Sequence, residues 1–587
     1  MCMKTLIVKK SLMYRYQTIG QAVQDAEAGD QIEINGGIYE EIVDVSKRLK
    51  LYGKGDVTIK GSVFIRYNVN AEMCNIRFSQ GRGLYIKGNL HLENCVVEQQ
   101  KSSAQVTVNF GSLAMKNVDI IGNSATPYGL RIDNGSSVML ETSTIQHHPK
   151  AQIIVQNSEI TMLRSKLLEG KANGIFALQN VKMDLVDCEI HGHDKAQIVT
   201  ANSTLSVKST LIHQGQGTGI QALEGSKVVM DNCVMKQHKS TDVIVYKSEL
   251  RAVNSVFADG EGKGIYVGEL SKAIIYDCEV YGHAKPQIFI ENSRAEIRKC
   301  CVKNGSATGI HLVNEADVIV TDSEVTDHSL FHVIVDASGL EMDNTVIQIG
   351  QSGGIFGNEH AKIMLKDTTI RELGSHLVYL NNCRLFTDNC TFSHMQGNGI
   401  SCIDSIFEIA NSQFVDCVHG PYAILWSDKS IGRVENSLVD ETERTFFAIT
   451  NGSLIEIINT NLSNVKLGAV VQENSNVYIQ GHVDEVNWQH DASSRIVNTS
   501  KMPPISDEKI QRIVGIISGP EVVDVEELSK EFQFPDELLV EVQTMIQNET
   551  IKKPHSVPIS NMRDSSCFNL KLEATRFLSI INWCNCI

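Results

Sequence analysis

The sequence has few of the residues that mark several common classes of protein. Its 587 residues include only 10 prolines, and aromatic residues make up 6%. There are 53 lysines and arginines against 69 aspartates and glutamates, and no basic run occurs, so we expect no nucleic-acid partner. The first 30 residues contain an apolar stretch of only a few residues and no small-residue cleavage site. We therefore expect no secretory signal, no membrane span and a cytoplasmic location.

Metal and phosphate motifs are scarce as well. The 15 cysteines include no pair with Cys-x-x-Cys spacing. Cys188, Cys233 and Cys278 occupy positions that are serine or threonine elsewhere in an internal repeat, so we expect small, buried, reduced side chains. Glycine-rich stretches such as "DGEGKGI" lack the spacing of a phosphate-binding loop, and we interpret them as bends that need positive φ.

The internal repeat covers most of the chain. A small residue recurs at alternating steps of 22 and 23 residues, as at Cys278, Cys300 and Ser323. The structural unit is therefore one turn of about 22 residues, and two turns of slightly different design make a longer period. That period appears as a glycine followed by leucine or isoleucine every 45 residues, at Gly129, Gly174, Gly219, Gly264, Gly309, Gly354 and Gly399.

The pattern inside one turn is typical of strands. Segments such as "GIYV", "KAIIYDCEV" and "QIFIEN" are rich in β-branched residues and are bounded by Gly, Asn, Ser and His. A 22-residue unit of short strands has no core of its own, so successive turns must stack about 4.8 Å apart and pair their strands. We predict an all-β, single-stranded parallel β-helix of about 18–20 coils. Ile265, Ile310 and Ile355 should share one interior column.

The N-terminal region carries a family resemblance. "YQTIGQAVQDAEAGDQIEINGGIYEEIVDV", from Tyr16 to Val45, resembles the opening of right-handed parallel β-helix proteins of the pectin lyase-like superfamily. Thr18 and Gln21 have the spacing of a capping box at the start of a short amphipathic helix. The resemblance extends over about residues 14–485. It implies a right-handed coil with an N-terminal capping helix, and the superfamily includes lyases, hydrolases, epimerases and scaffolds.

The repeat stops near residue 490, and composition then divides the chain. We predict an N-terminal cap with the first strands over 1–48, the β-helix over 49–490 and a polar, Pro-containing linker over 491–505. Residues 506–553 should form a small helical module like a helix-turn-helix, and 554–587 an irregular tail. The abrupt change at the tail suggests an unusual or truncated terminus.

Carboxylates recur in one column of the repeat. The resemblance implies catalysis on acidic glycans by carboxylates clustered on neighbouring coils, often with Ca²⁺ or arginine. Asp277, Asp322 and Asp367 are the candidate catalytic residues, but they lie two coils apart, at about 9.6 Å, with Ser, Asn or Lys between them. The competing interpretation is a hydrogen-bonded Asp/Asn ladder at a bend of each coil.

Histidines form a second column, with His148, His193, His238, His283 and His328 at 45-residue intervals. We interpret these as turn or surface histidines. His191 and His213 lie one coil apart in another column, with His193 nearby, and these three are the candidate metal ligands. We identify no carboxylate or thiolate in that register to complete a metal site.

Two classes of function follow. The first is a non-catalytic scaffold that binds a protein or carbohydrate partner along its flank, with C-terminal helices for recruitment or homo-oligomerisation. The alternative is a carbohydrate-active enzyme, of the lyase, hydrolase or epimerase type, acting on an acidic glycan. We expect no cofactor under the first hypothesis, and Ca²⁺ only under the second.

Overall fold

The computed structural model describes residues 3–417, 423–440, 442–483 and 486–498. The helical module and the tail predicted over 506–553 and 554–587 lie outside these ranges, as does the second half of the predicted linker. The chain divides into two compact units, Met1–Ile355 and Phe356–Ile587, which are described separately. Among the described residues, no helix has the length and apolar character needed to cross a membrane.

Unit 1 begins with a cap. Strand β1 (Thr5–Val8) pairs in parallel with β2 (Gln31–Tyr39), and helix α1 (Ile19–Asp25) lies between them in sequence. The predicted capping box is present, because the Thr18 side chain accepts from the Gln21 amide and the Gln21 side chain accepts in return. Ile19, Ala22 and Val23 are buried, which confirms the predicted apolar face.

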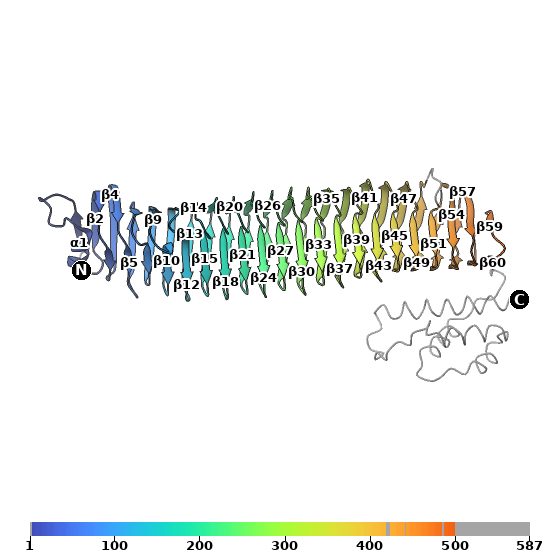
Figure 1. Cartoon of the computed structure of the whole chain (residues 1–587), viewed down its shortest axis with the longest axis horizontal. Coiled ribbons are helices and arrows are strands. Elements are labelled where there is room, and N and C mark those ends of the chain that lie inside the picture. The colour runs from blue at the N-terminus through green and yellow to red at the C-terminus, as the bar shows by residue number, and fades with distance from the viewer. Residues whose placement is uncertain (1–2, 418–422, 441, 484–485, 499–587) are drawn as a thin grey trace, which may run out of the picture. The chain divides into compact units, whose positions relative to one another are not determined.

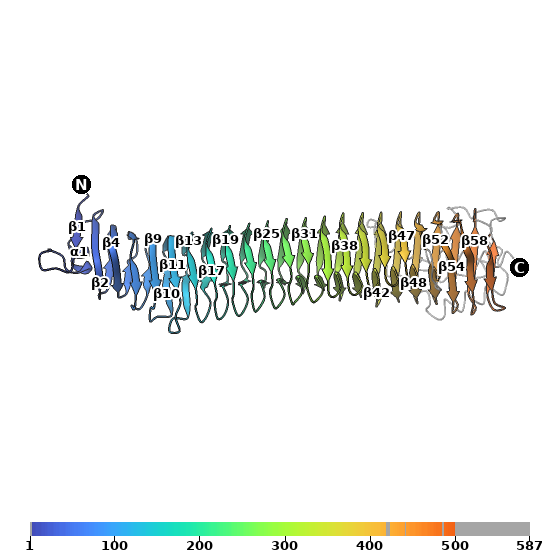
Figure 2. The same cartoon turned by 90° about the horizontal axis from the view of Figure 1, so that it is seen from above.

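Each regular coil of unit 1 contributes three short strands to two parallel sheets. In one coil these are β30 (Ile265–Gly268) in sheet B, then β31 (Lys272–Tyr276) and β32 (Glu279–Tyr281) in sheet A. Figures 1 and 2 show the strands of successive coils stacked side by side. Ile265, Ile310 and Ile355 are completely buried, as the sequence predicts. Ile288 pairs with both Ile265 and Ile310 in register.

The remaining strands of unit 1 repeat this arrangement. Those of sheet B are β3 (Val43–Val45), β5 (Val63–Ile65), β8 (Leu84–Ile86), β10 (Ala104–Asn109), β12 (Tyr128–Asp133), β15 (Ile153–Gln156), β18 (Ile175–Leu178), β21 (Ile198–Ala201), β24 (Ile220–Leu223), β27 (Val243–Tyr246), β33 (Ile288–Glu291), β36 (Ile310–Val313) and β39 (Val333–Asp336). Those of sheet A are β4 (Leu49–Lys60), β6 (Asn70–Cys74), β7 (Arg77–Ser79), β9 (Asn89–Glu98), β11 (Ser112–Ile121), β13 (Ser137–Glu141), β14 (Thr144–Gln146), β16 (Glu159–Leu163), β17 (Lys166–Leu168), β19 (Lys182–Val186), β20 (Glu189–His191), β22 (Thr204–Lys208), β23 (Leu211–His213), β25 (Lys227–Asp231), β26 (Val234–Lys236), β28 (Glu249–Val253), β29 (Val256–Ala258), β34 (Arg294–Arg298), β35 (Cys301–Gly305), β37 (Asp317–Thr321), β38 (Glu324–His328), β40 (Gly339–Asp343) and β41 (Val346–Gly350).

Unit 2 has the same coil design. Its strands, with β42 beginning at the last residue of unit 1, are β42 (Ile355–Asn358), β43 (Lys362–Lys366), β44 (Thr369–Leu373), β45 (Val378–Asn381), β46 (Arg384–Asp388), β47 (Thr391–Met395), β48 (Ile400–Ile403), β49 (Ile406–Ala410), β50 (Gln413–Val415), β51 (Leu425–Asp428), β52 (Ile431–Glu435), β53 (Leu438–Val439), β54 (Thr442–Thr450), β55 (Leu454–Ile458), β56 (Asn461–Leu462), β57 (Val465–Val471), β58 (Asn476–Gln480), β59 (Trp488–His490) and β60 (Arg495–Asn498). Stacked Phe392 and Phe414 rings, 4.9 Å apart, add aromatic packing to its core.

The described residues thus form an all-β, right-handed parallel β-solenoid, as predicted, with about 22 turns instead of 18–20. The difference arises where the repeat is irregular. The single long strand β4 pairs with both β6 and β7, so the two sheet A strands of a later coil are continuous here. Such a coil lacks the small residue at the bend by which coils are counted in the sequence.

The interior histidine column corrects one prediction. His148, His193, His238, His283 and His328 are buried, with exposed fractions of 0–1%, so they are not surface residues, although the first four lie between strands as the turn interpretation expects. Each ring packs on glycines of the coil before it. A Cβ atom at Gly170 would lie 2.7 Å from the His193 Cδ2 atom, and one at Gly174 3.1 Å from Cε1. The glycines therefore alternate with histidines because the imidazole needs their space.

The same contacts correct the interpretation of the "DGEGKGI" turn. Gly260, Gly262 and Gly264 do not have positive φ. A side chain at Gly260 would meet His283, and one at Gly264 would lie 2.5 Å from the Gln287 carbonyl oxygen. The requirement at these glycines is close packing between coils.

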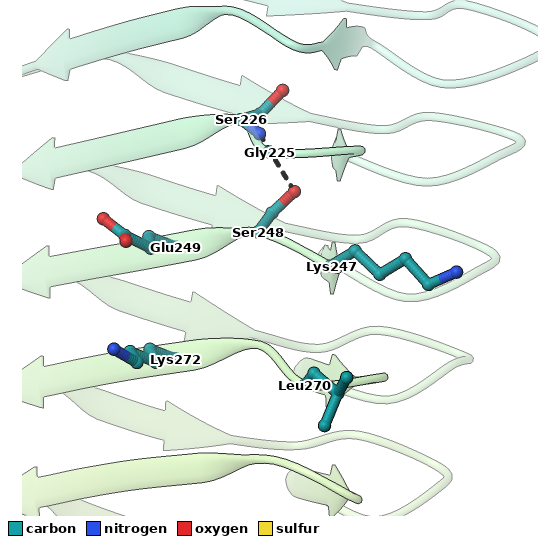
Figure 3. Close-up of a pocket in the computed structure, with 7 residues that line it drawn as sticks. All are labelled: Gly225, Ser226, Lys247, Ser248, Glu249, Leu270 and Lys272. Carbon is teal, nitrogen blue, oxygen red and sulfur yellow. Dashed lines mark hydrogen bonds between the residues drawn. The ribbon is translucent and has the colours of Figure 1, made fainter.

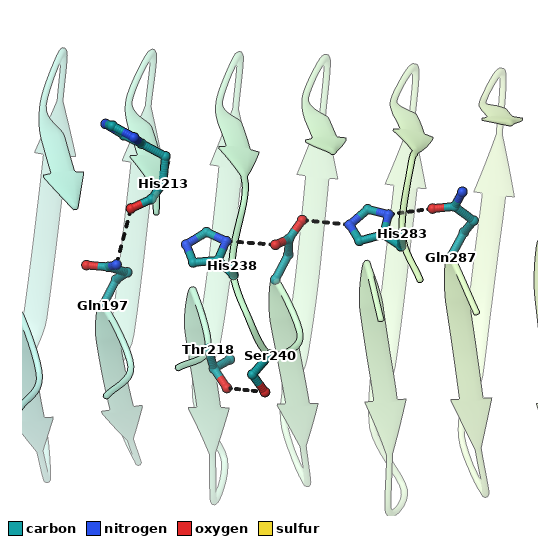
Figure 4. Close-up of polar contacts among 8 residues, drawn as sticks. Gln197, His213, Thr218, His238, Ser240, His283 and Gln287 are labelled. Carbon is teal, nitrogen blue, oxygen red and sulfur yellow. Dashed lines mark hydrogen bonds and ion pairs between the residues drawn. The ribbon is translucent and has the colours of Figure 1, made fainter. Parts of the chain in front are cut away.

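Side chains of glutamine or aspartate complete the interior column. His148 and His193 bond through Nδ1 to Gln152 and Gln197. Asp242 replaces glutamine in one coil and joins two histidines, with its oxygens 2.7 Å from His238 Nδ1 and 2.9 Å from His283 Nε2. Figure 4 shows this network, which continues to Gln287. Burial lowers the pKa of His148 and of His193 to about 4, so both are neutral at pH 7.

The column of small residues is buried as predicted. Thr210 Oγ1 accepts from the Cys188 amide of the preceding coil, and the Cys188 thiol donates to the Val186 carbonyl. The described cysteines from Cys74 to Cys417 are free thiols. Hydroxyl and thiol groups are interchangeable here because both donate to the carbonyl two residues earlier.

Candidate functional site

The outer face of sheet B in unit 1 carries a row of aromatic side chains. In β30 the buried Ile265 and Val267 flank the half-buried Tyr266, which points outward because side chains alternate along a strand. Tyr266 pairs in register with Phe289 of β33, and Phe289 with His311 of β36. We refer to Lys263, Tyr266, Phe289, Glu291, His311 and Asp336 as the outer row.

A lysine from the preceding turn lies on these rings. The Tyr266 and Phe289 ring centres are 5.7 Å apart, and those of Phe289 and His311 are 5.1 Å apart. The Lys263 Nζ atom is 3.6 Å from the Phe289 ring centre and 4.7 Å from that of Tyr266. The ring faces attract the ammonium group, while its partial burial lowers the pKa of Lys263.

The outer row also contains two groups suited to proton transfer. The Tyr266 hydroxyl donates to Glu291 Oε2 at 2.8 Å, and burial together with this carboxylate raises the pKa of Tyr266 to about 12. His311 Nε2 lies 3.3 Å from Asp336 Oδ2. Burial lowers the pKa of His311, although Asp336 opposes the shift. At neutral pH the tyrosine is therefore protonated and the imidazole neutral.

Lys263 has no ion-pair partner in the part of the chain that the structure describes, where no carboxylate oxygen lies within 4.0 Å of its Nζ atom. Glu291 affects its charge only at longer range. A half-buried ammonium held by ring faces is thus available to an anion from solution.

The predicted catalytic aspartates lie elsewhere, at the bend between the two sheet A strands. Asp277, Asp322 and Asp367 have φ values of 53°, 51° and 47°. This left-handed conformation favours Asn and Asp. Asn344 Nδ2 donates to Asp322 Oδ1 at 2.7 Å, and Asn389 donates to Asp367 within unit 2. Asp322 and Asp367 thus accept hydrogen bonds from an asparagine of the next coil, and Asp277 shares their bend conformation. The hydrogen bonds of the outer row involve none of the three.

Of the predicted metal ligands, the structure brings two together. His191 and His213 lie on the outer face of sheet A, with ring centres 4.8 Å apart. His193 belongs to the buried interior column, where it bonds to Gln197, and it is not part of the group that His191 and His213 form. Sequence analysis missed Glu189, which reaches His213 with its Oε1 atom 3.4 Å from Nε2. The signal was present, because residues two apart on a strand share a face.

Two shallow hollows lie at turns. Figure 3 shows the first, of about 130 Å³, where Lys247 and Leu270 follow sheet B strands and Glu249 and Lys272 begin sheet A strands. The second, of about 220 Å³, is lined by polar residues including Lys239. Neither contains a residue of the outer row.

Comparison with solved structures gives distant similarities. A mutant of the periplasmic alginate epimerase AlgG has 8% identity and a TM-score of 0.34, over 55% of this chain and 77% of that chain. The A-module of the Azotobacter vinelandii mannuronan C-5 epimerase AlgE4 has 11% identity and a TM-score of 0.22, over 69% and 92%. The PL6 family alginate lyase AlyGC has 11% identity and a TM-score of 0.22, over 84% and 97%.

Sequence comparison is more direct. A search of curated proteins found no match. The family model described as right handed beta helix region matches residues 57–212, 198–348 and 353–500, about three quarters of the chain. The repeat, the parallel pairing of successive coils and this match agree, and the chain belongs to the right-handed β-helix family.

Proposed function

We propose that this protein acts on an acidic polysaccharide at the outer row, by moving a proton next to a carboxylate group of the sugar. The observation that carries this proposal is the unpaired Lys263 ammonium, held on the Phe289 and Tyr266 rings beside a neutral histidine. This is the carbohydrate-active enzyme that the sequence offers as its alternative function.

Lys263 would bind the carboxylate of a uronic acid unit. Pairing with a cation makes the hydrogen on the adjacent carbon more acidic, because the negative charge that develops on the carboxylate is stabilised. The ammonium group is partly desolvated, so less water competes for the anion. A glycan chain lying along the coil stack would place this unit near Phe289.

His311 and Tyr266 lie on either side of Phe289, one coil away in each direction. If His311 Nε2–H donates to Asp336, Nδ1 is left with a free lone pair, and a neutral imidazole oriented by a carboxylate is a suitable general base. Tyr266 would be the acid if its hydroxyl proton, which Glu291 accepts in the free protein, turned to the bound glycan. The acid and the base therefore flank the position of the bound carboxylate.

Two reactions use this arrangement. In both, His311 takes the proton from the carbon next to the carboxylate, and the electron pair passes into the carboxylate. In a lyase reaction the glycosidic oxygen then leaves with a proton from Tyr266, and a carbon–carbon double bond forms. In an epimerase reaction Tyr266 returns a proton to the same carbon from the opposite side.

Calcium does not fit the outer row. Ca²⁺ takes about six to eight oxygen ligands. Here Glu291 and Asp336 are the carboxylates, and they are bonded to Tyr266 and His311 beside the Lys263 cation. No step of the proposed reaction passes through a metal ion.

A non-catalytic scaffold is the second candidate. The observation that favours it is the continuation of the outer row by Ile244 and Ile334, which pair in register with Tyr266 and His311 and are half-buried. A half-buried apolar strip of this kind suits a protein partner bound along the flank. The C-terminal helices expected to recruit a further partner lie outside the described residues.

The test uses the full chain and a panel of acidic polysaccharides, including alginate and polygalacturonate, with a neutral glucan as the control. The ultraviolet absorbance of unsaturated sugars reports lyase activity, and proton exchange with D₂O, followed by NMR, reports epimerisation. We expect one of these signals on an acidic glycan, lost in Lys263→Met and His311→Gln and kept in Lys239→Met, which removes an exposed lysine. Binding without either signal would favour the scaffold. Absence of both binding and reaction would contradict the enzyme and leave the scaffold for a protein partner.

A further inference from the structure

A second site lies on the outer face of sheet A in unit 1, in a different sheet from the outer row. Strands β20 and β23 are neighbours, with Glu189 in register with Leu211 and His191 with His213. His191 and His213 therefore stack on one face, with their rings inclined at 35°. Glu189 is two residues before His191 on the same strand and shares that face.

The three side chains converge. Glu189 Oε1 is 3.4 Å from His213 Nε2 and 3.9 Å from His191 Nε2, and one ligand atom from each residue lies within 4.8 Å of the other two. Bonds of about 2.0–2.2 Å to a shared ion would need slightly shorter separations, which small side-chain rotations on an outer face supply. Exposed fractions of 22% for His191, 12% for His213 and 30% for Glu189 leave the ion accessible from solution.

We propose that Glu189, His191 and His213 bind one divalent transition metal ion, with Zn²⁺ the natural occupant. Two imidazole nitrogens and one carboxylate oxygen are ligands that suit Zn²⁺, Cu²⁺ or Ni²⁺ and are too few in oxygen for Ca²⁺ or Mg²⁺. Three protein ligands leave at least one coordination position open for water or an outside ligand. The site is independent of the proposed glycan function.

Two neighbouring lysines have opposite effects on metal binding at this site. Lys166 Nζ lies 2.8 Å from Glu189 Oε2, which fixes the carboxylate and leaves Oε1 for the ion. Lys236 follows His213 in the same column, and its charge contributes to lowering the pKa of His213, behind the larger effect of burial. A nearby ammonium also repels a bound cation, so affinity should be lower than that of a closed structural zinc site.

The chain supplies a matched control. His147 Nδ1 lies 3.6 Å from Glu169 Oε2, and this exposed pair has a histidine and a glutamate but is not part of a three-ligand group among the described residues. A His147→Asn variant therefore removes a surface His–Glu pair without touching the proposed site.

The experiment titrates the full chain with Zn²⁺ alone by calorimetry, and with Co²⁺ to record the visible absorption of the bound ion. We expect binding of one ion that is weakened about tenfold or more in Glu189→Gln and in His213→Asn. Binding should be unchanged in His147→Asn and tighter in Lys236→Met. Since Lys236 is not a ligand, its effect separates a metal site from a merely structural cluster.

Three results would overturn the proposal. The first is no binding to the folded wild-type chain. The second is binding that Glu189→Gln and His213→Asn leave unchanged. The third is equal weakening by His147→Asn, which would show that any surface histidine suffices. Circular dichroism of each variant without metal confirms that the fold is retained, as expected for outward side chains.

Discussion

In unit 1, the buried segment that leads from sheet A to sheet B differs from the outer face of sheet B. In the buried segment, a histidine and a glutamine or aspartate in one coil alternate with two glycines in the next, over several 45-residue periods. On the outer face, the strands of sheet B present Ile244, Tyr266, Phe289, His311 and Ile334 in succession, with no period at all. The interior is constrained by contacts with its own neighbouring coils, whereas the outer face is free to vary with whatever it binds.

This contrast shows where to look for function in a repeat protein. Residues that return with the period, including the aspartates at the bends, serve contacts between coils. Residues that break the period on an outer face are not needed for the contacts that recur between all the coils. Lys263 occurs once in the repeat pattern, as does the group of Glu189, His191 and His213, and both lie on outer faces.

A charge inside the stack should have the largest effect. Ile310→Asp places an unpaired carboxylate among fully buried aliphatic side chains, and we expect it to lower the free energy of unfolding by about 4 kcal/mol or more. Ile334→Asp, on the outer face of the adjacent strand, should cost about 1 kcal/mol or less. Denaturant melts of the two variants measure the difference, and similar losses would contradict the assignment of the two faces.

The second-largest effect on the free energy of unfolding should come from acid, which protonates the buried histidines. The pKa of His193 in the folded chain is about 4, against an ordinary value of 6.5, so the unfolded chain binds more protons between these pH values. Stability therefore rises with pH in this range. The contribution of each such histidine to the free energy of unfolding is fully present above pH 6.5. It falls by about 3 kcal/mol as the pH drops to 4.

Denaturant midpoints recorded from pH 7 to pH 4 test this slope. A His193→Asn variant, compared with wild type, should lose one histidine's share of the pH dependence. An outer-face variant, His311→Gln, should keep nearly all of it. A pH profile that is identical in wild type and His193→Asn would show that His193 is not buried in its neutral form.

Added volume at a periodic glycine should have a moderate effect. A Cβ atom at Gly264 would lie 2.5 Å from the Gln287 carbonyl oxygen and 3.0 Å from the His283 ring, so Gly264→Ala should cost about 1–3 kcal/mol. Gly135→Ala is the control for backbone strain, because Gly135 has φ +72° and nothing within 4 Å. If Gly135→Ala lowered the free energy of unfolding more than Gly264→Ala, backbone conformation would matter more than lack of space at the glycines of the repeat.

The smallest effect on stability should come from the outer row itself. Tyr266→Phe removes the hydrogen bond to Glu291 from a half-exposed position, so we expect a change of about 1 kcal/mol or less in the free energy of unfolding. Turnover of the acidic glycan should nevertheless fall by tenfold or more, because the acid is lost. A variant that is fully active would remove Tyr266 from the proposed reaction.

Much of the fold could be predicted from the sequence because the same residue pattern recurs in successive coils. The strand pattern, the interior isoleucines and the Thr18 capping box all follow from local periodicity. The burial of the histidines did not, since polarity argues for the surface unless the glycines beneath the rings are recognised as space. The number of turns was underestimated where long strands such as β4 remove the bend residue.

The candidate sites were harder to predict for a different reason. Asp277 and Asp322 repeat visibly, yet their φ values show a backbone requirement at the bend. Lys263 belongs to a turn, and only the structure shows that it reaches over Phe289 of the next coil. Glu189 was within reach of sequence reasoning, since a two-residue offset on a strand places it beside His191.

The interlocking of imidazoles with glycines also limits how such a chain can change its length. Removing the coil that contains Gly215 and Gly219 would set the His193 coil directly against the His238 coil, and the His238 ring would meet side chains where it now meets bare backbone. Adding one coil would leave two glycine coils facing a void. A genetic duplication or deletion is therefore tolerated only in steps of two coils, so that the gene grows or shrinks by 45 codons at a time while the outer face is left free to diverge.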